Sequence, residues 1–208
     1  MQPAAGPVEL KLVFVGDSSC GKTCCIVAHT QGRFVDAQPP SAFDVSASEV
    51  RVDGEHAVAL SMWDTSGDAE FDRLRPLSYD AADCVVVVFS VVEPLSLASA
   101  RARWCPEAAH FCPAVPIVLV GTKVDLRADR DTIGRLDARG VDPVSPEQGA
   151  KAAKELGALG YFECSAKTFA GVSATFEGTA RTTLERRRDE KLRAGAREAT
   201  GGCGCAVS

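Results

Sequence analysis

The sequence predicts a doubly wound α/β domain, in which a mostly parallel sheet carries helices on both of its faces. Several short, continuous runs of apolar and mainly β-branched residues are typical of strands that are buried on both sides. These runs alternate along the chain with segments of helical character, which is the pattern of an α/β fold. The length of 208 residues suits one such domain with tails.

The predicted elements follow one another in a regular order. The apolar runs predict strands at residues 10–15, 84–91, 116–121 and 161–166. Residues 49–54 and 57–64 predict a hairpin around Asp53-Gly54. Helices are predicted at 22–31, 94–110, 146–157 and 171–188, the third opening with an N-cap serine followed by proline in Ser145-Pro146. We expect residues 1–9 to be loose, residues 10–185 to form the domain, and residues 186–208 to form a tail.

Composition excludes several classes of protein. A net charge of −5 argues against a sequence-independent nucleic-acid binder, which needs an excess of Lys and Arg. The nine cysteines are scattered, and the N-terminus lacks the features of a secretory signal, so we expect the reducing cytosol. The three histidines show no zinc-site spacing. The sequence predicts small, buried, apolar roles for Cys20, Cys24, Cys25, Cys84 and Cys164.

A phosphate-binding motif follows the first predicted strand directly. The stretch GDSSCGKT fits the P-loop pattern G-x-x-x-x-G-K-[ST] and comprises Gly16, Asp17, Ser18, Ser19, Cys20, Gly21, Lys22 and Thr23. In this setting backbone amides surround a polyphosphate, Lys22 reaches the outer phosphates, and the Thr23 hydroxyl binds magnesium. The alternative is an ordinary glycine-rich turn, but a strand before and a helix after the motif favour nucleotide binding.

Two further motifs predict which base is bound. Thr122, Lys123 and Asp125 close one predicted strand in GTKVD, and Ser165, Ala166 and Lys167 close another in ECSAK. The Asp125 carboxylate can accept hydrogen bonds from N1 and the exocyclic amine of guanine, a donor pair that adenine lacks. Either string alone could be a solvated loop, but ligands collect where successive strands end in such sheets. The sequence therefore favours GTP over ATP, and a P-loop kinase or ATPase is further opposed by the absence of lid-like arginine segments.

With these motifs the chain resembles a small GTPase of the Ras superfamily, and within it the Rho family. The resemblance covers residues 10 to about 185 and the C-terminal tail. Its Rho-like features are TKVDLR, the stretch FDRLRPLSY, and a charged segment that resembles the extra helix of Rho proteins, at about residues 127–140.

The resemblance implies roles for further residues. Phe34 would pack on guanine, Ser41 and Asp64 would hold Mg²⁺, Asp64 through water, and the Gly67 amide would bind the γ-phosphate. Phe43 and Asp44 would belong to the surface that binds effector proteins. The implied ligands are GTP, GDP and Mg²⁺, and the implied partners are effectors, which bind the two switch segments (switch I around Ser41, switch II from Asp64), and exchange factors.

Several departures from the family pattern converge on hydrolysis. Asp68 stands where a typical Rho protein has the glutamine that orients the attacking water. Ser18 replaces a glycine, and a side chain there would crowd both that residue and an incoming arginine finger. Gln38, Ser41 and Ser66 replace tyrosine, threonine and alanine. The pattern is similar to Rnd-type and other GTPase-deficient Rho proteins, although no single subgroup matches throughout. Lys22 of this chain would still bind phosphate. The alternative is a cycling enzyme that hydrolyses GTP slowly and responds to exchange and activating proteins.

The tail predicts membrane attachment. Residues 186–197 carry six basic side chains against two acidic ones, and the terminal Cys205-Ala-Val-Ser fits a farnesylation motif. One lipid anchors only marginally, so a second signal is needed. The basic stretch facing an anionic inner leaflet, or palmitoylation of Cys203, could supply it. We therefore expect a lipid-anchored protein on the cytoplasmic face of the plasma membrane or endomembranes.

Overall fold

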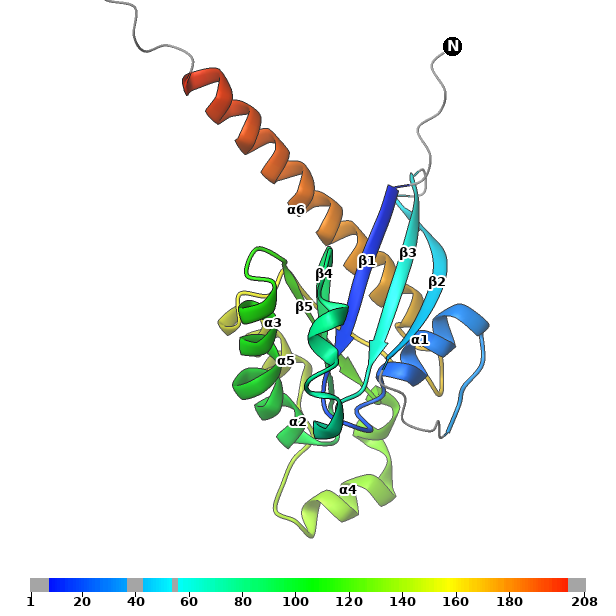
Figure 1. Ribbon diagram of the computed structural model, residues 1–208. Coiled ribbons are helices and arrows are strands. Elements are labelled where there is room, and N and C mark those ends of the chain that lie inside the picture. The colour runs from blue at the N-terminus through cyan, green and yellow to red at the C-terminus, as the bar shows by residue number, and fades with distance from the viewer. Residues whose placement is uncertain (1–7, 37–42, 54–55, 202–208) are drawn as a thin grey trace, which may run out of the picture.

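A six-stranded sheet forms the centre of the molecule, in a computed structural model that describes residues 8–36, 43–53 and 56–201 (Figure 1). Its strands are β1 (Val8–Val15), β2 (Phe43–Val52), β3 (His56–Thr65), β4 (Cys84–Ser90), β5 (Ile117–Thr122) and β6 (Gly160–Glu163). They lie in the order β2-β3-β1-β4-β5-β6, and only the β2–β3 pair is antiparallel. The predicted doubly wound, mostly parallel sheet is confirmed.

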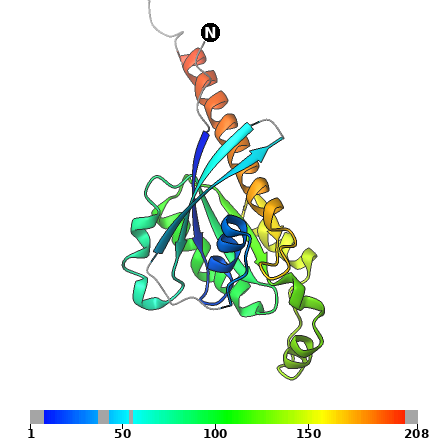
Figure 2. The same cartoon turned by 90° about the vertical axis from the view of Figure 1, so that its right-hand side faces the viewer.

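Helices cover both faces of this sheet (Figures 1 and 2). On one face lie α1 (Lys22–Gln31) and α6 (Val172–Gly201), whose Ile26, Phe176 and Ala180 pack on strand residues of the first core cluster. The other face carries α2 (Pro94–Ser99), a π-helical turn η3 (Ala100–Trp104), α3 (Cys105–Phe111) and α5 (Pro146–Glu155). There, Trp104 and Ala152 pack on Val85, Val87 and other strand residues in a second core cluster.

Some elements differ in length from the prediction. β1 begins at Val8, so Val8 and Glu9 pair with β3 instead of belonging to a loose N-terminal segment. β2 begins at Phe43, well before the predicted residue 49; its exposed, partly polar first half hides the alternation on which the prediction depended. β6 ends at Glu163, which leaves Cys164, Ser165 and Ala166 in the following loop. Helix 94–110 is confirmed, with the π-helical turn just before Pro106, a residue that lacks the amide needed for regular helical bonding.

Short elements connect these layers. Two 3₁₀ turns, η1 (Ala69–Phe71) and η2 (Arg75–Ser78), follow β3, and a third, η4 (Val124–Ala128), follows β5. Helix α4 (Arg130–Asp137) lies in the charged segment where a short extra helix was expected, and Asp129 caps it by accepting from the Thr132 amide. The predicted start of α5 is confirmed, because Ser145 and Gln148 form a reciprocal capping box.

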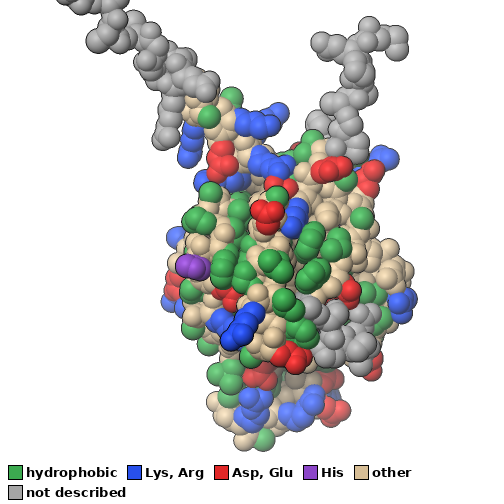
Figure 3. Space-filling view, in the orientation of Figure 1, with side chains coloured by type: hydrophobic (Ala, Val, Ile, Leu, Met, Phe, Trp, Pro, Cys, Tyr) green, Lys and Arg blue, Asp and Glu red, His purple; other side chains and the backbone are tan. Residues whose placement is uncertain are grey.

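Helix α6 is longer than predicted and projects beyond the sheet (Figure 1). It continues to Gly201 rather than ending near residue 188, since the charged segment is rich in good helix formers and Arg186 pairs with Glu190 one turn later. Lys and Arg side chains gather with a few acidic ones where this helix leaves the domain (Figure 3). Across the described ranges, none of the helices combines the length and apolar character needed to cross a bilayer.

Candidate nucleotide-binding site

The loop between β1 and α1 has the backbone geometry of a phosphate cradle. Gly16 has φ of 151°, and a Cβ atom there would lie 2.2 Å from the Val88 carbonyl oxygen. Gly21 has φ of 100° and directly precedes α1. Both positions therefore require glycine. The loop leads into the N-terminus of α1, where backbone amides and the helix dipole favour an anion.

The Lys22 side chain lies folded over this loop. It is only 6 % exposed, and its ammonium group donates to the carbonyl oxygens of Gly16 and Asp17, both at 2.9 Å. The Asp17 side chain does not face the cavity, since its carboxylate accepts from the Trp104 indole nitrogen at 2.7 Å. Lys22 thus presents a positive charge next to the cradle, at a point where a phosphate oxygen would be neutralised.

Residues at the start of α1 and the end of β3 are suitable ligands for a hard cation such as Mg²⁺. The Thr23 hydroxyl donates to Asp64 Oδ2 at 2.5 Å, while Asp64 Oδ1 is buried without a hydrogen-bond partner among the described residues. Burial raises the pKa of the Asp64 carboxyl, although the Thr23 hydrogen bond and Lys22 oppose the shift. A buried, unpaired carboxylate oxygen beside a hydroxyl is a donor set that Mg²⁺ prefers. Ser41, the other expected ligand, lies outside the described residues, as does Gln38.

Switch II begins close against the phosphate loop. A Cβ atom at Gly67 would lie 2.4 Å from the Gly16 carbonyl oxygen and 2.5 Å from the Ser18 amide nitrogen, so only glycine fits. The Asp68 carboxylate accepts hydrogen bonds from the Ser18 hydroxyl and, at 3.4 Å, from the Ser66 hydroxyl. The Ser66 oxygen also accepts from the Asp68 amide at 3.2 Å. Asp68 is therefore in direct contact with two other residues that depart from the Rho pattern, Ser18 and Ser66.

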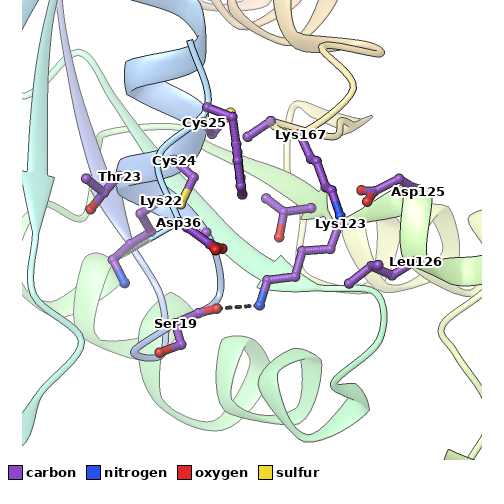
Figure 4. A pocket seen from close by; sticks show the side chains of 14 residues that line it. Ser19, Lys22, Thr23, Cys24, Cys25, Asp36, Lys123, Asp125, Leu126 and Lys167 are labelled. Atoms are coloured by element: carbon purple, nitrogen blue, oxygen red, sulfur yellow. Dashed lines mark hydrogen bonds between the residues drawn. The ribbon is translucent and has the colours of Figure 1, made fainter. Parts of the chain in front are cut away.

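A cavity of about 530 Å³ runs from the phosphate loop to the ends of β5 and β6 (Figure 4). Ser19, Lys22 and Thr23 lie toward one end of it, and Asp125 and Lys167 toward the other. Lys123, in a left-handed conformation with φ of 62°, spans between them and donates to the Ser19 carbonyl oxygen at 2.7 Å. The cavity thus joins the predicted phosphate and base sites into one elongated pocket.

The predicted residues divide into those that line this pocket and those that support it. Its lining includes the predicted residues Ser19, Gly21, Lys22, Thr23, Phe34, Thr122, Lys123, Asp125, Ala166 and Lys167. Ser165 is fully buried; its amide donates to the Ala170 carbonyl and its hydroxyl accepts from the Thr168 amide. A backbone donor to the base must therefore come from Ala166 or Lys167. Cys20 is buried behind the loop, where its carbonyl accepts from the Thr122 hydroxyl.

Sequence reasoning missed several residues of the site. Cys24, Cys25, Asp36 and Leu126 also line the pocket. Cys24 is half-buried and donates to the Val35 carbonyl, so its predicted role as a fully buried apolar residue is wrong. Its position directly after the P-loop motif could have indicated a place in the pocket wall. Cys20, Cys25, Cys84 and Cys164 are buried, as predicted.

A buried arginine, which the sequence analysis did not single out, supports the backbone of switch II. Arg75 is 1 % exposed and forms a two-pronged ion pair with Glu107 of α3, at 2.6 and 2.8 Å. It also pairs with Asp72 and donates to the Ser66 carbonyl at 3.2 Å. Burial alone would lower the pKa of Arg75, but these carboxylates raise it overall. The guanidinium therefore stays charged and fixes the backbone next to Gly67.

The expected effector residues lie at the exposed start of β2. Phe43 is 38 % exposed, and its ring stacks on that of Trp63 at a centroid distance of 5.7 Å. Asp44 follows it on the strand and is directly opposite Asp64 in the β2–β3 register. The arrangement places an exposed aromatic ring at the edge of the sheet, next to the candidate metal ligand.

Comparison with known proteins identifies the family. The Ras family model matches residues 11–185, which is most of the chain. The chain is also 44 % identical over 183 residues to the GTP-binding protein RHO1 of Saccharomyces cerevisiae, covering 88 % of this chain and 87 % of that protein. With its P-loop, its buried Asp64 and its elongated pocket, the chain therefore belongs to the Ras family of small GTPases and, within it, to the Rho proteins.

Proposed function

We propose that this protein is a membrane-tethered, Rho-type switch that binds GTP and GDP with Mg²⁺, and that its hydrolysis of GTP is impaired. Bound GTP would then persist, and the protein would act mainly as a binding module for effectors. Effectors would contact Phe43, Asp44 and switch II, and control of the actin cytoskeleton is the output that the family favours. Exchange factors would remain possible partners.

Nucleotide binding is supported by the two ends of the pocket. The amides of residues 16–23 and Lys22 would hold the phosphates, while Asp125 would select guanine and Lys123 and Phe34 would flank the base. Thr23, Ser41 and Asp64 would hold Mg²⁺, which neutralises phosphate charge when it is bound. Lys22 would orient and stabilise phosphate oxygens, and Gly67, whose backbone lies against the phosphate loop, would donate its amide to the γ-phosphate.

Impaired hydrolysis is supported by one observation, the hydrogen bonding of Asp68 to Ser18 and Ser66. A glutamine at this position orients water by both donating and accepting. An ionised aspartate can only accept, is one methylene shorter, and here directs its oxygens to two serine hydroxyls. Its negative charge next to the γ-phosphate would also oppose the charge that develops during phosphoryl transfer.

Single-turnover hydrolysis of pre-bound GTP tests this proposal. We expect the full-length chain to be nearly inert, and the Ser18→Gly/Asp68→Gln double variant to hydrolyse GTP at least about tenfold faster, because the variant regains a water-orienting amide and loses the serine contact. Glu70→Gln, which adds an amide at an exposed neighbouring position, serves as the matched control and should change nothing. An ordinary small-GTPase rate in the parent chain would instead support the alternative, a conventional cycling GTPase in which Asp68 is a working substitute.

A further inference from the structure

Two buried cysteine thiols are in contact next to the nucleotide pocket. The Sγ atoms of Cys25, in α1, and Cys164, directly after β6, are 3.4 Å apart, although 139 residues separate them along the chain. Their side chains are 1 % and 0 % exposed. A disulfide bond is about 2.05 Å long, so the two sulfur atoms need only a short approach to be joined.

The contact between the two sulfurs allows oxidation of either one to be followed by attack of the other. The thiolate is the reactive form of cysteine, and once one sulfur is oxidised to a sulfenic acid, the second is already in contact with it and can act as its resolving partner.

The pocket offers a route to these otherwise enclosed sulfurs. Cys25 lies in the pocket wall, and Ala166, two residues after Cys164, lies in it as well. A small oxidant that enters the cavity therefore meets Cys25 in the cavity wall, and the Cys164 sulfur is in contact with it. Packing of two small apolar side chains would also account for the contact, and the experiment below separates these explanations.

We propose that Cys25 and Cys164 form a reversible disulfide on exposure to a peroxide, and that this bond loosens the pocket's hold on guanine nucleotide. The thiolate of one cysteine attacks a peroxide oxygen, the O–O bond breaks, and the departing hydroxide takes up the proton that the thiol released, so that a sulfenic acid and one water result. The sulfur of the other cysteine then attacks the sulfenic sulfur, and hydroxide leaves with that cysteine's proton as a second water. Two thiols are oxidised by two electrons and the peroxide is reduced. A thiol reductant reverses the bond by exchange, as expected for a cytosolic disulfide.

The effect on nucleotide binding, which rests on the proposed function, follows from where the two cysteines lie. Cys164 immediately precedes the Ser165–Lys167 turn at the base end of the pocket, and Cys25 lies two residues after Thr23. Joining the sulfurs draws this turn toward α1. Hydrogen bonds to the base tolerate shifts of only a few tenths of an ångström, so the oxidised protein should hold guanine less firmly.

Non-reducing peptide mapping of the full chain after hydrogen peroxide treatment tests the bond itself. We expect a peptide pair that joins residues 25 and 164, disappears with dithiothreitol, and is absent from Cys25→Ala and from Cys164→Ala. Cys112→Ala, which removes another buried cysteine, should leave the cross-link intact. Absence of this pair in the unmodified chain, or oxidation that stops at isolated sulfinic acids, would overturn the proposal.

Release of fluorescent GDP from the same samples tests the coupling. We expect release at least about threefold faster from oxidised than from reduced protein, and no difference in either single-cysteine variant, since lost base contacts act on the dissociation rate. A cross-link with unchanged release would show that the coupling to nucleotide is wrong. Failure to bind any guanine nucleotide would instead contradict the proposed function, and the peptide map would still decide whether the disulfide forms.

Discussion

At the scale of single residues, Asp64 is the group on which the candidate metal site depends most. Its raised pKa means that the folded protein holds a proton on this carboxyl more strongly than the unfolded chain does. The ionised form therefore costs stability at pH values above that raised pKa, and the cost is removed as the pH falls through it. A bound cation would remove the same cost by pairing with the buried Oδ1 atom.

We expect Mg²⁺ to stabilise the nucleotide-loaded protein, and we expect this effect to weaken as protons compete for Asp64 at acidic pH. Asp64→Asn should abolish most of the Mg²⁺ dependence, because the amide keeps the shape but not the charge. Thermal unfolding with and without EDTA, over a range of pH, measures the effect. Asp137→Asn, an exposed change in α4, is the control and should retain the full Mg²⁺ response. An equal response in the two variants would remove Asp64 from the metal site.

At the scale of elements, ion pairs and ring contacts around Arg75 connect α3 to switch II, and we call this set of contacts the Arg75 brace. Arg75 pairs with Glu107, and the Trp104 indole lies next to the guanidinium groups of Arg75 and Arg103, at 4.7 and 4.2 Å from the ring centroid. The same indole donates to Asp17 in the phosphate loop. A continuous set of contacts therefore connects η3 and α3 to the phosphate loop, through Trp104, and to the Ser66 backbone, through Arg75.

We expect the loss of one member of the Arg75 brace to lower the free energy of unfolding. Among the described residues, Glu107→Ala leaves the buried Arg75 guanidinium with Asp72 as its remaining ion-pair partner. We expect a loss of about 3 kcal/mol in the free energy of unfolding, as for other buried pairs that lose one member. The exposed pair between Arg101 and Glu155 provides the matched control: Glu155→Ala should cost less than about 1 kcal/mol. Urea denaturation of both variants decides the matter, and similar losses would mean that burial of Arg75 has no special importance.

The sequence predicted the sheet and much of the pocket because both leave local patterns. Apolar runs such as residues 84–91 are characteristic of buried strands, and the P-loop has a fixed spacing. The brace leaves no such pattern, since Arg75 sits in the charged stretch FDRLRPLSY and resembles a surface residue. The contact between Cys25 and Cys164 was also unpredictable, because it depends on how α1 and the end of β6 meet in three dimensions.

At the scale of the whole molecule, the long helix α6 starts within the domain and continues through most of the predicted tail, to Gly201. Arg187 secures it near the sheet, donating to the Glu9 carbonyl and pairing with Asp83. Beyond this point the described side chains of residues 191–195 are exposed. Cys203 and Cys205 lie outside the described residues, so lipid attachment remains a prediction from sequence. Within the described residues, the pocket and the exposed C-terminal end of α6 are far apart along the molecule (Figure 1), so nucleotide binding and membrane attachment can be tested separately.

Binding of the farnesylated chain to vesicles containing anionic lipid tests whether the basic helix assists the anchor. Residues 186–197 carry a net charge of +4, and each basic residue near an anionic surface contributes about 1 kcal/mol. Replacing Arg188, Lys191 and Arg193 by glutamine should therefore weaken binding by about a hundredfold at physiological salt, with little change on neutral vesicles. The Cys205→Ser variant should carry no lipid and should lose most of its binding to both kinds of vesicle, because a net charge of +4 alone gives only weak anchoring. Equal binding of the glutamine variant to the two kinds of vesicle, with no loss relative to the parent chain, would show that the lipid acts alone and that the charge of α6 serves another purpose.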